Sequence, residues 1–116
     1  MVPTNNPATL LVVEDMEEIR TGMKKSLSGY GYQVLEATNA DEAIEVASRS
    51  PPDLIFTEEK LPTLGDLTTR IRQLPDLHHV PIVIVNPDKE DAHDGDIIVL
   101  ADYDRLPALL VRTREK

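Results

Sequence analysis

The run Thr9-Leu10-Leu11-Val12-Val13-Glu14-Asp15 decides the fold class of this 116-residue chain. Its first five residues form an uninterrupted run without a charge, and two acids follow at once. A run of this length and character is typical of a strand that is buried on both faces, as in a parallel sheet. The run therefore predicts an α/β fold, with the acid pair Glu14 and Asp15 at the carboxyl end of one strand.

Four further runs of the same kind alternate with segments whose apolar residues have helical spacing, except at one connection. The expected strands are 9–13, 33–37, 53–57, 82–85 and 97–100. This alternation predicts a single doubly wound, five-stranded parallel sheet with helices on both faces. We expect one domain at residues 9–116, after a flexible N-terminal tail at residues 1–8.

Capping patterns mark where the helices begin. Asp15 with Glu18 three residues later, and Asn39 with Glu42, both have the spacing of a capping box. Asp104 is expected to cap the last helix.

The connection between the fourth and fifth expected strands is short. Only eleven residues, 86–96, separate Val85 from Ile97, and a parallel crossover needs roughly 10–12 residues. We therefore predict a loop or a single helical turn here, so that the fourth helix is shortened or missing. The edge strand 97–100 would then need cover from the last helix or a partner chain. Partner binding or self-association, including a homodimer, is expected to use the fifth strand and last helix.

Composition excludes several classes of function. Twenty-one acids against twelve Lys and Arg give a net charge of −9, which argues against direct nucleic-acid binding and against an anionic membrane surface. The chain has no cysteine, so disulfides and thiol chemistry are excluded. No apolar run approaches the roughly 20 residues of a membrane-spanning helix, and the first residues do not resemble a signal peptide. A cytoplasmic location is expected.

Ligands of open α/β sheets bind beyond the carboxyl ends of the strands. The residues that follow the apolar runs there are Glu14, Asp15, Glu58, Asn86 and Ala101. Three of them are carboxylates, and they come from two different strands. We expect these three carboxylates to lie within a few ångströms of one another.

The chain resembles the receiver domain of bacterial two-component response regulators from about Thr9 to Val111. The order and spacing of several short matches carry the resemblance. They are Leu11-Val12-Val13-Glu14-Asp15 followed by Ile19-Arg20, Tyr30-Gly31-Tyr32-Gln33-Val34, Asp41-Glu42-Ala43, Pro52-Asp53-Leu54-Ile55, Leu61-Pro62 and Val80-Pro81-Ile82-Val83.

The resemblance implies phosphoryl transfer to an aspartate. A receiver uses an acidic pair for Mg²⁺, the aspartate nucleophile, a Thr or Ser and a Lys that contact the phosphoryl group, and often an aromatic that turns inward. By position these become the pair Glu14 and Asp15, the nucleophile position Glu58, the hydroxyl position Asn86, the aromatic position Ile98 and the Lys position Ala101. The last four depart from the family, so the chain resembles a degenerate receiver, or pseudo-receiver.

Three functions follow as hypotheses. The first is a non-enzymatic signalling module that contacts a histidine kinase-related or output protein, with little or no control by phosphorylation and with no required cofactor. The second is an active receiver that accepts phosphate with Mg²⁺ at Glu14, Asp15 and Glu58; the remote third is a small metal-dependent enzyme. We expect weak Mg²⁺ or Ca²⁺ binding at best. The alternative to a metal site is that Glu14-Asp15 are only a helix cap and a solvated acid. The alternative to a functional position is that Glu58 is a surface carboxylate without a role.

Overall fold

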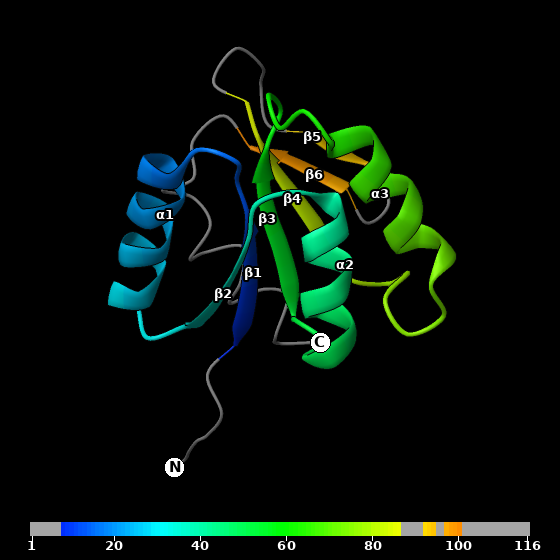
Figure 1. Ribbon diagram of the computed structural model, residues 1–116, viewed down its shortest axis with the longest axis horizontal. Coiled ribbons are helices and arrows are strands. Elements are labelled where there is room, and N and C mark those ends of the chain that lie inside the picture. Colours follow the sequence, from blue (N-terminus) through cyan, green and yellow to red (C-terminus); the bar gives the residue numbers. More distant parts are fainter. Residues whose placement is uncertain (1–7, 87–91, 95–96, 101–116) are drawn as a thin grey trace.

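The computed structural model describes residues 8–86, 92–94 and 97–100 (Figure 1). Its elements follow in the order β1 (Thr9–Val13), α1 (Glu17–Gly29), β2 (Gln33–Ala37), α2 (Ala40–Arg49), β3 (Leu54–Glu58), α3 (Leu64–Gln73), β4 (Ile82–Val85), β5 (Ala92–Asp94) and β6 (Ile97–Leu100). The strands expected at 9–13, 33–37, 82–85 and 97–100 have the predicted bounds. The third strand begins and ends one residue later than expected, so Glu58 is its last residue.

The sheet has the strand order β2-β1-β3-β4-β6-β5. Its first five strands in that order are parallel to their neighbours, and β5 is antiparallel to β6. Figure 1 shows α1 on one face of the sheet and α2 with α3 on the other. The predicted doubly wound parallel architecture is therefore present, but the sheet contains a sixth, antiparallel strand.

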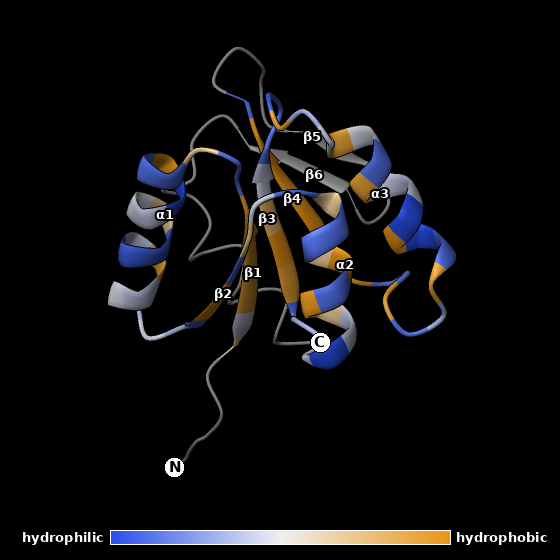
Figure 2. Ribbon diagram, viewed as in Figure 1, coloured by the Kyte–Doolittle hydropathy of each residue, from blue (hydrophilic) through white to orange (hydrophobic). Residues whose placement is uncertain are grey.

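Each face of the sheet has its own apolar core, because side chains alternate along a strand. Leu10, Val12 and Phe56 point to the face on which Met23 and Leu27 of α1 pack. Alternate residues of the same strands face α2 and α3 and form the larger cluster. Figure 2 shows the apolar residues gathered on the strands and on the inner sides of the helices. Burial on both faces explains why the strands are apolar at successive positions.

The two expected capping boxes have different outcomes. Asn39 is the N-cap of α2 and accepts a hydrogen bond from the Glu42 backbone N–H at 2.9 Å, as predicted. At α1 the N-cap is Met16, with no side-chain cap bond, so the box at Asp15 and Glu18 is wrong. The carboxylate of Glu14 instead accepts from the Met16 N–H, at the N-cap position, at 3.0 Å.

The connection after β4 contains the strand β5, where a loop or one helical turn was expected. β5 pairs with β6 in the register Ala92↔Val99 to Asp94↔Ile97. β5 therefore runs antiparallel along the edge of β6 that faces away from β4. This pairing means that β5 covers the edge of β6, a role that we had assigned to the last helix or to a partner.

The remaining predictions concern the two ends of the chain, which are the expected N-terminal tail and the expected last helix. Ala8, the last residue of the expected tail, is buried at 2 % exposure, and its carbonyl accepts from the Gln33 N–H. Residues 1–7, Ala101 and the predicted last helix from Asp104 lie outside the described residues. No helix among the described residues is long and apolar enough to span a membrane.

Candidate functional site

Three carboxylates meet at the carboxyl ends of β1 and β3. Glu14 and Asp15 follow β1, and Glu58 ends β3. One carboxylate oxygen from each residue lies within 4.8 Å of the others. The chain leaves β1 for β2 on one side and later enters β3 on the other, so this point is where the strand order reverses, the usual ligand position in such sheets. The predicted convergence of Glu14, Asp15 and Glu58 is present.

Glu14 is fully buried, whereas Asp15 is exposed and Glu58 is half-buried. The Glu14 Oε2 atom accepts from the Met16 N–H at 3.0 Å. Its Oε1 atom is buried without a hydrogen-bond partner within the described part of the chain. Burial, together with the neighbouring Asp15 and Glu58 carboxyls, raises the pKa of the Glu14 carboxyl to about 7, against the lowering effect of the Met16 hydrogen bond.

Side-chain contacts fix the two strands at this edge. The buried Thr57 hydroxyl donates to the Val13 carbonyl at 2.8 Å, which ties β3 to the end of β1 one residue before each acid. Glu58 lies opposite Val85 in the β3–β4 register. The position of Glu58 is therefore set by strand pairing on one side and by the Thr57 contact on the other.

The other positions that the family uses are placed as follows. Asn86 comes directly after β4 and is buried at 8 % exposure. Its Nδ2 atom donates to Glu59 Oε1 at 3.4 Å, so this hydrogen bond is made to the residue after Glu58. Ile98 lies in β6 opposite Val83. Ala101 is outside the described residues, so its relation to the acids is not described.

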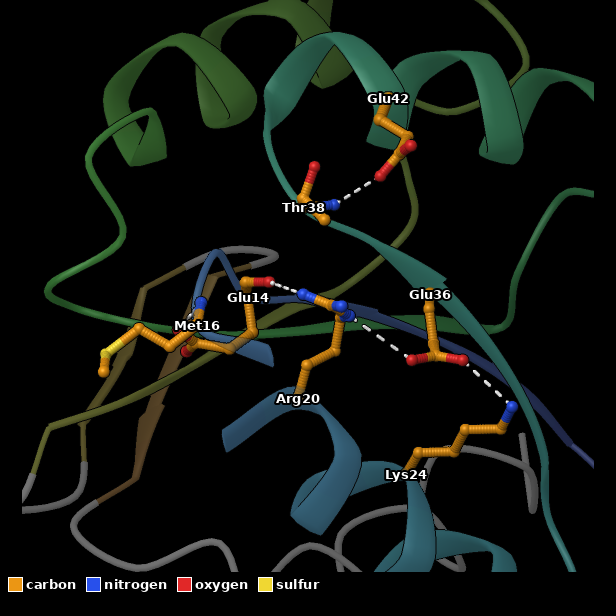
Figure 3. A network of polar contacts seen from close by, with 7 residues as sticks. All are labelled: Glu14, Met16, Arg20, Lys24, Glu36, Thr38 and Glu42. Carbon is orange, nitrogen blue, oxygen red and sulfur yellow. Dashed lines mark hydrogen bonds and ion pairs between the residues drawn. The ribbon is translucent and has the colours of Figure 1, made fainter. Parts of the chain in front are cut away.

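A basic residue that sequence reasoning did not assign also contacts the site. Arg20, in the first turns of α1, donates from Nη1 to the Glu14 carbonyl at 2.9 Å and from Nε to Glu36 Oε1 at 3.3 Å. Lys24 holds the other Glu36 oxygen at 2.9 Å. Figure 3 shows the chain of contacts from Lys24 through Glu36 and Arg20 to Glu14. In the sequence, only the helical spacing of Arg20 and Lys24 hinted that both lie on one side of α1.

The acidic cluster fits a hard divalent cation. Such ions prefer carboxylate oxygens, and Mg²⁺ is commonly held by one or two carboxylates together with water. Glu14 has a buried oxygen without a partner among the described residues, and one carboxylate oxygen each of Glu14, Asp15 and Glu58 lies within 4.8 Å of the others. When bound, a cation would neutralise charge at this edge of the sheet. The residues that would hold it are Glu14, Asp15 and Glu58.

The sheet order and the acids at the point where that order reverses define a flavodoxin-like α/β module with an acidic ligand site. A model of the response regulator receiver domain matches residues 10–104. The chain therefore belongs to the response regulator receiver family. Members of this family are signalling modules that interact with histidine kinases and output domains, and they typically bind Mg²⁺ at an acidic site.

Known proteins of several architectures resemble the chain. It is 33 % identical over 85 residues to the sensor histidine kinase TmoS of Ectopseudomonas mendocina, a match that covers 70 % of this chain and 9 % of TmoS. It is 28 % identical over 81 residues to the polar-differentiation response regulator DivK of Brucella anthropi, covering 68 % of this chain and 66 % of DivK. The chain thus spans less than two thirds of the length of TmoS, and slightly under two thirds of DivK.

A solved structure shows the same fold. The receiver domain of the sensor histidine kinase PA1611 from Pseudomonas aeruginosa superimposes with a TM-score of 0.79 at 22 % identity. The match covers 95 % of this chain and 99 % of that domain, which has a magnesium ion coordinated in its active site cleft. At this identity the likeness concerns the fold.

Proposed function

We propose that this receiver domain is a signalling module that acts through protein–protein contacts without conventional aspartyl phosphorylation. The observation that carries the proposal is Glu58 as the last residue of β3, beside Glu14 and Asp15. A glutamate side chain is one methylene longer than an aspartate. Its carboxylate is therefore displaced by more than about 1 Å from the point of in-line attack, and a misplacement of that order can cost about 10²-fold in rate.

The other departures at the family's positions support the same function. Asn86 has no hydroxyl that could contact a phosphoryl group, and its amide donates to Glu59. Ala101 has no ammonium group to neutralise charge on the transferred group. Loss of one such donor costs roughly 2.7–4 kcal/mol in other enzymes that stabilise anionic transition states. Even a phosphorylated chain would therefore lack the usual means of reading the phosphoryl group.

The test is incubation with acetyl phosphate and Mg²⁺, followed by intact mass measurement. We expect no adduct with the mass of one phosphoryl group. A stoichiometric adduct lost in Glu58→Gln would support the alternative function, an active receiver with a variant site. The acidic cluster with its buried Glu14 oxygen favours that alternative. A receiver domain of known activity, treated in parallel, controls for the donor.

We further propose that Glu14, Asp15 and Glu58 bind a divalent cation weakly. The buried Glu14 oxygen supports binding, whereas the longer Glu58 side chain fills space that water ligands would need. Calorimetry with Mg²⁺ is expected to give a dissociation constant weaker than micromolar. A micromolar site would contradict the degenerate assignment and favour the active receiver.

The partner is proposed to be a histidine kinase-related or output protein that contacts the β5–β6 side of the sheet. Support comes from β5, which gives this side a different backbone from the helix expected in the family. A homodimer through the fifth parallel strand, β6, and the last helix is the second form of this proposal. Light scattering over a concentration series tests it, since a monomer at every concentration would leave only the heterologous partner.

A further inference from the structure

Arg20 reaches two acceptors on two different strands. Its guanidinium donates to the Glu14 carbonyl, directly after β1, and to the Glu36 carboxylate in β2. The side chain is only 16 % exposed, compared with 48 % for Lys24. A planar guanidinium can make two such bonds in fixed directions, whereas an ammonium is a single compact charge. Arg20 therefore joins α1 to the end of β1 and to β2.

The main chain of Glu14 is held on both sides. Its N–H donates to the Ala37 carbonyl at 3.0 Å, and its carbonyl accepts from Arg20 at 2.9 Å. With both backbone groups fixed, the side chain leaves the backbone in one direction. Oε2 then accepts from the Met16 N–H, and a carboxylate oxygen of Glu14 lies in the acidic cluster. The Arg20 contact is one of the two main-chain contacts that determine where the Glu14 carboxylate lies.

Arg20 does this without neutralising the cluster. Its hydrogen bonds go to a carbonyl and to Glu36, not to the carboxylates of Glu14, Asp15 or Glu58. Glu36 pairs its single negative charge with both Arg20 and Lys24, and the two cations lower the pKa of its carboxyl, Lys24 more strongly. The negative charge of the cluster is therefore left for an external cation.

We propose that Arg20 is the positioning residue of the acidic cluster: it fixes the main chain of Glu14 while its guanidinium pairs with Glu36, so that the three carboxylates stay together and available to a divalent cation. The inference rests on the cation site put forward under the proposed function. It assigns to α1 a part in ligand binding through a residue that touches neither the cation nor a phosphoryl group.

The first experiment compares Mn²⁺ affinity in the full chain by calorimetry. Arg20→Met removes both hydrogen bonds, and Arg20→Lys keeps the charge but cannot reproduce the two-acceptor geometry. Both are expected to weaken binding by about 10–100-fold, as found for outer partners of metal ligands. The matched control is Lys24→Met, which removes only the outer contact to Glu36 and is expected to leave the affinity within about twofold. Equal affinities in all variants would overturn the inference.

A second readout needs no metal. The Met16 N–H is bonded to Glu14 Oε2, so its hydrogen exchange reports whether the Glu14 carboxylate is in place. We expect exchange at Met16 to accelerate about fivefold in Arg20→Met and to be unchanged in Lys24→Met. Unchanged exchange in Arg20→Met would overturn the positioning role. Thermal unfolding of each variant confirms that it is folded.

The two readouts separate the inference from the cation site on which it rests. If the natural chain binds no Mn²⁺ while Met16 exchange still depends on Arg20, the cation site fails and the positioning role stands. If Mn²⁺ binds and neither readout responds to Arg20, the cation site stands and the positioning role fails.

Discussion

Glu14 combines a fixed backbone with a poorly solvated carboxyl group. The side chain has no exposure, and its Oε1 atom finds no donor among the described residues. An ionised carboxylate in such a place has lost its hydration without full replacement by hydrogen bonds. Protonation or a bound cation relieves that loss. The same feature therefore governs both the pH dependence of folding and the affinity for a cation.

Glu14→Gln is expected to stabilise the metal-free protein at pH 8. In the natural chain the Glu14 pKa is about 7, above its ordinary value of 4.5. Below pH 4.5 the group is protonated in both the folded and unfolded states. As the pH rises to about 7, the unfolded state loses its proton first, so the free energy of unfolding falls by at most about 3 kcal/mol. Glutamine has the same shape and no charge, so the variant escapes this loss.

The measurement is urea denaturation at a series of pH values in the presence of a chelator. The difference between variant and natural chain should be near zero at pH 4 and largest above pH 7. Glu17→Gln, at an exposed position of the same region, is the control and should show no such trend. A Glu14→Gln variant that is less stable than the natural chain at pH 8 would contradict the argument.

At the residue scale, sequence predicted the acids but not their support. Glu14, Asp15 and Glu58 could be predicted because each stands at the end of an apolar run, and parallel strands bring their carboxyl ends together. The contacts that Arg20 and Met16 make with Glu14 could not be predicted from the sequence. Both depend on how far a side chain reaches between elements that are separate in the sequence, and no local pattern encodes that reach.

Helices α2 and α3 are attached to the sheet by their apolar sides rather than by the ion pairs between them. Leu67 of α3 is fully buried in the larger core cluster. Arg70, also in α3, pairs with Asp66 at 3.3 Å and with Asp41 of α2. These charges are solvated, and exposed ion pairs contribute little to stability.

Leu67→Ala is therefore expected to reduce the free energy of unfolding by about 2–5 kcal/mol, since it leaves a cavity in a close-packed cluster. Arg70→Ala, on the same helix, is the matched control and should shift the denaturation midpoint only slightly. Both variants are measured by urea denaturation in the same buffer. A larger loss from Arg70→Ala than from Leu67→Ala would mean that the pairing of the helices, not the core, holds this layer.

The element that sequence did not predict is β5. Ala-His-Asp, residues 92–94, has neither an apolar run nor a β-branched residue, so nothing in its composition favours a strand. Its strand conformation comes from pairing with β6. One signal was present: Asp94 pairs with Ile97, the two residues between them are Gly95-Asp96, and Gly-Asp between two strands is a sequence signal for a tight hairpin. We had taken Asp94-Gly95 as part of a crossover instead.

Across the whole molecule, the acidic cluster lies at one end of the sheet and β6 lies two strands away from β3. A receiver that switches must transmit a change at the β3 end to that distant side. Transmission requires a contact that differs between two states, not merely a modified side chain. In this chain the positions that would make such a contact are Asn86, Ile98 and Ala101, and none offers the hydroxyl, aromatic or ammonium group that the family uses.

Restoring the nucleophile alone should therefore not restore switching. Glu58→Asp shortens the side chain to the length that in-line attack requires, so acetyl phosphate with Mg²⁺ is expected to modify it more readily than the natural chain. Intact mass measures the extent of modification. Amide chemical shifts in ¹H–¹⁵N spectra measure its reach, and we expect changes confined to residues near Glu14, Asp15 and the modified position. Beryllofluoride in place of acetyl phosphate gives a stable version of the same test.

The control is Glu58→Asn, which has the shorter side chain without a nucleophilic carboxylate. This variant should neither gain mass nor show changes in its amide chemical shifts. Changes that spread along β4 into β6 after modification of Glu58→Asp would show that the sheet still transmits the signal, and that Glu58 alone keeps this receiver from switching.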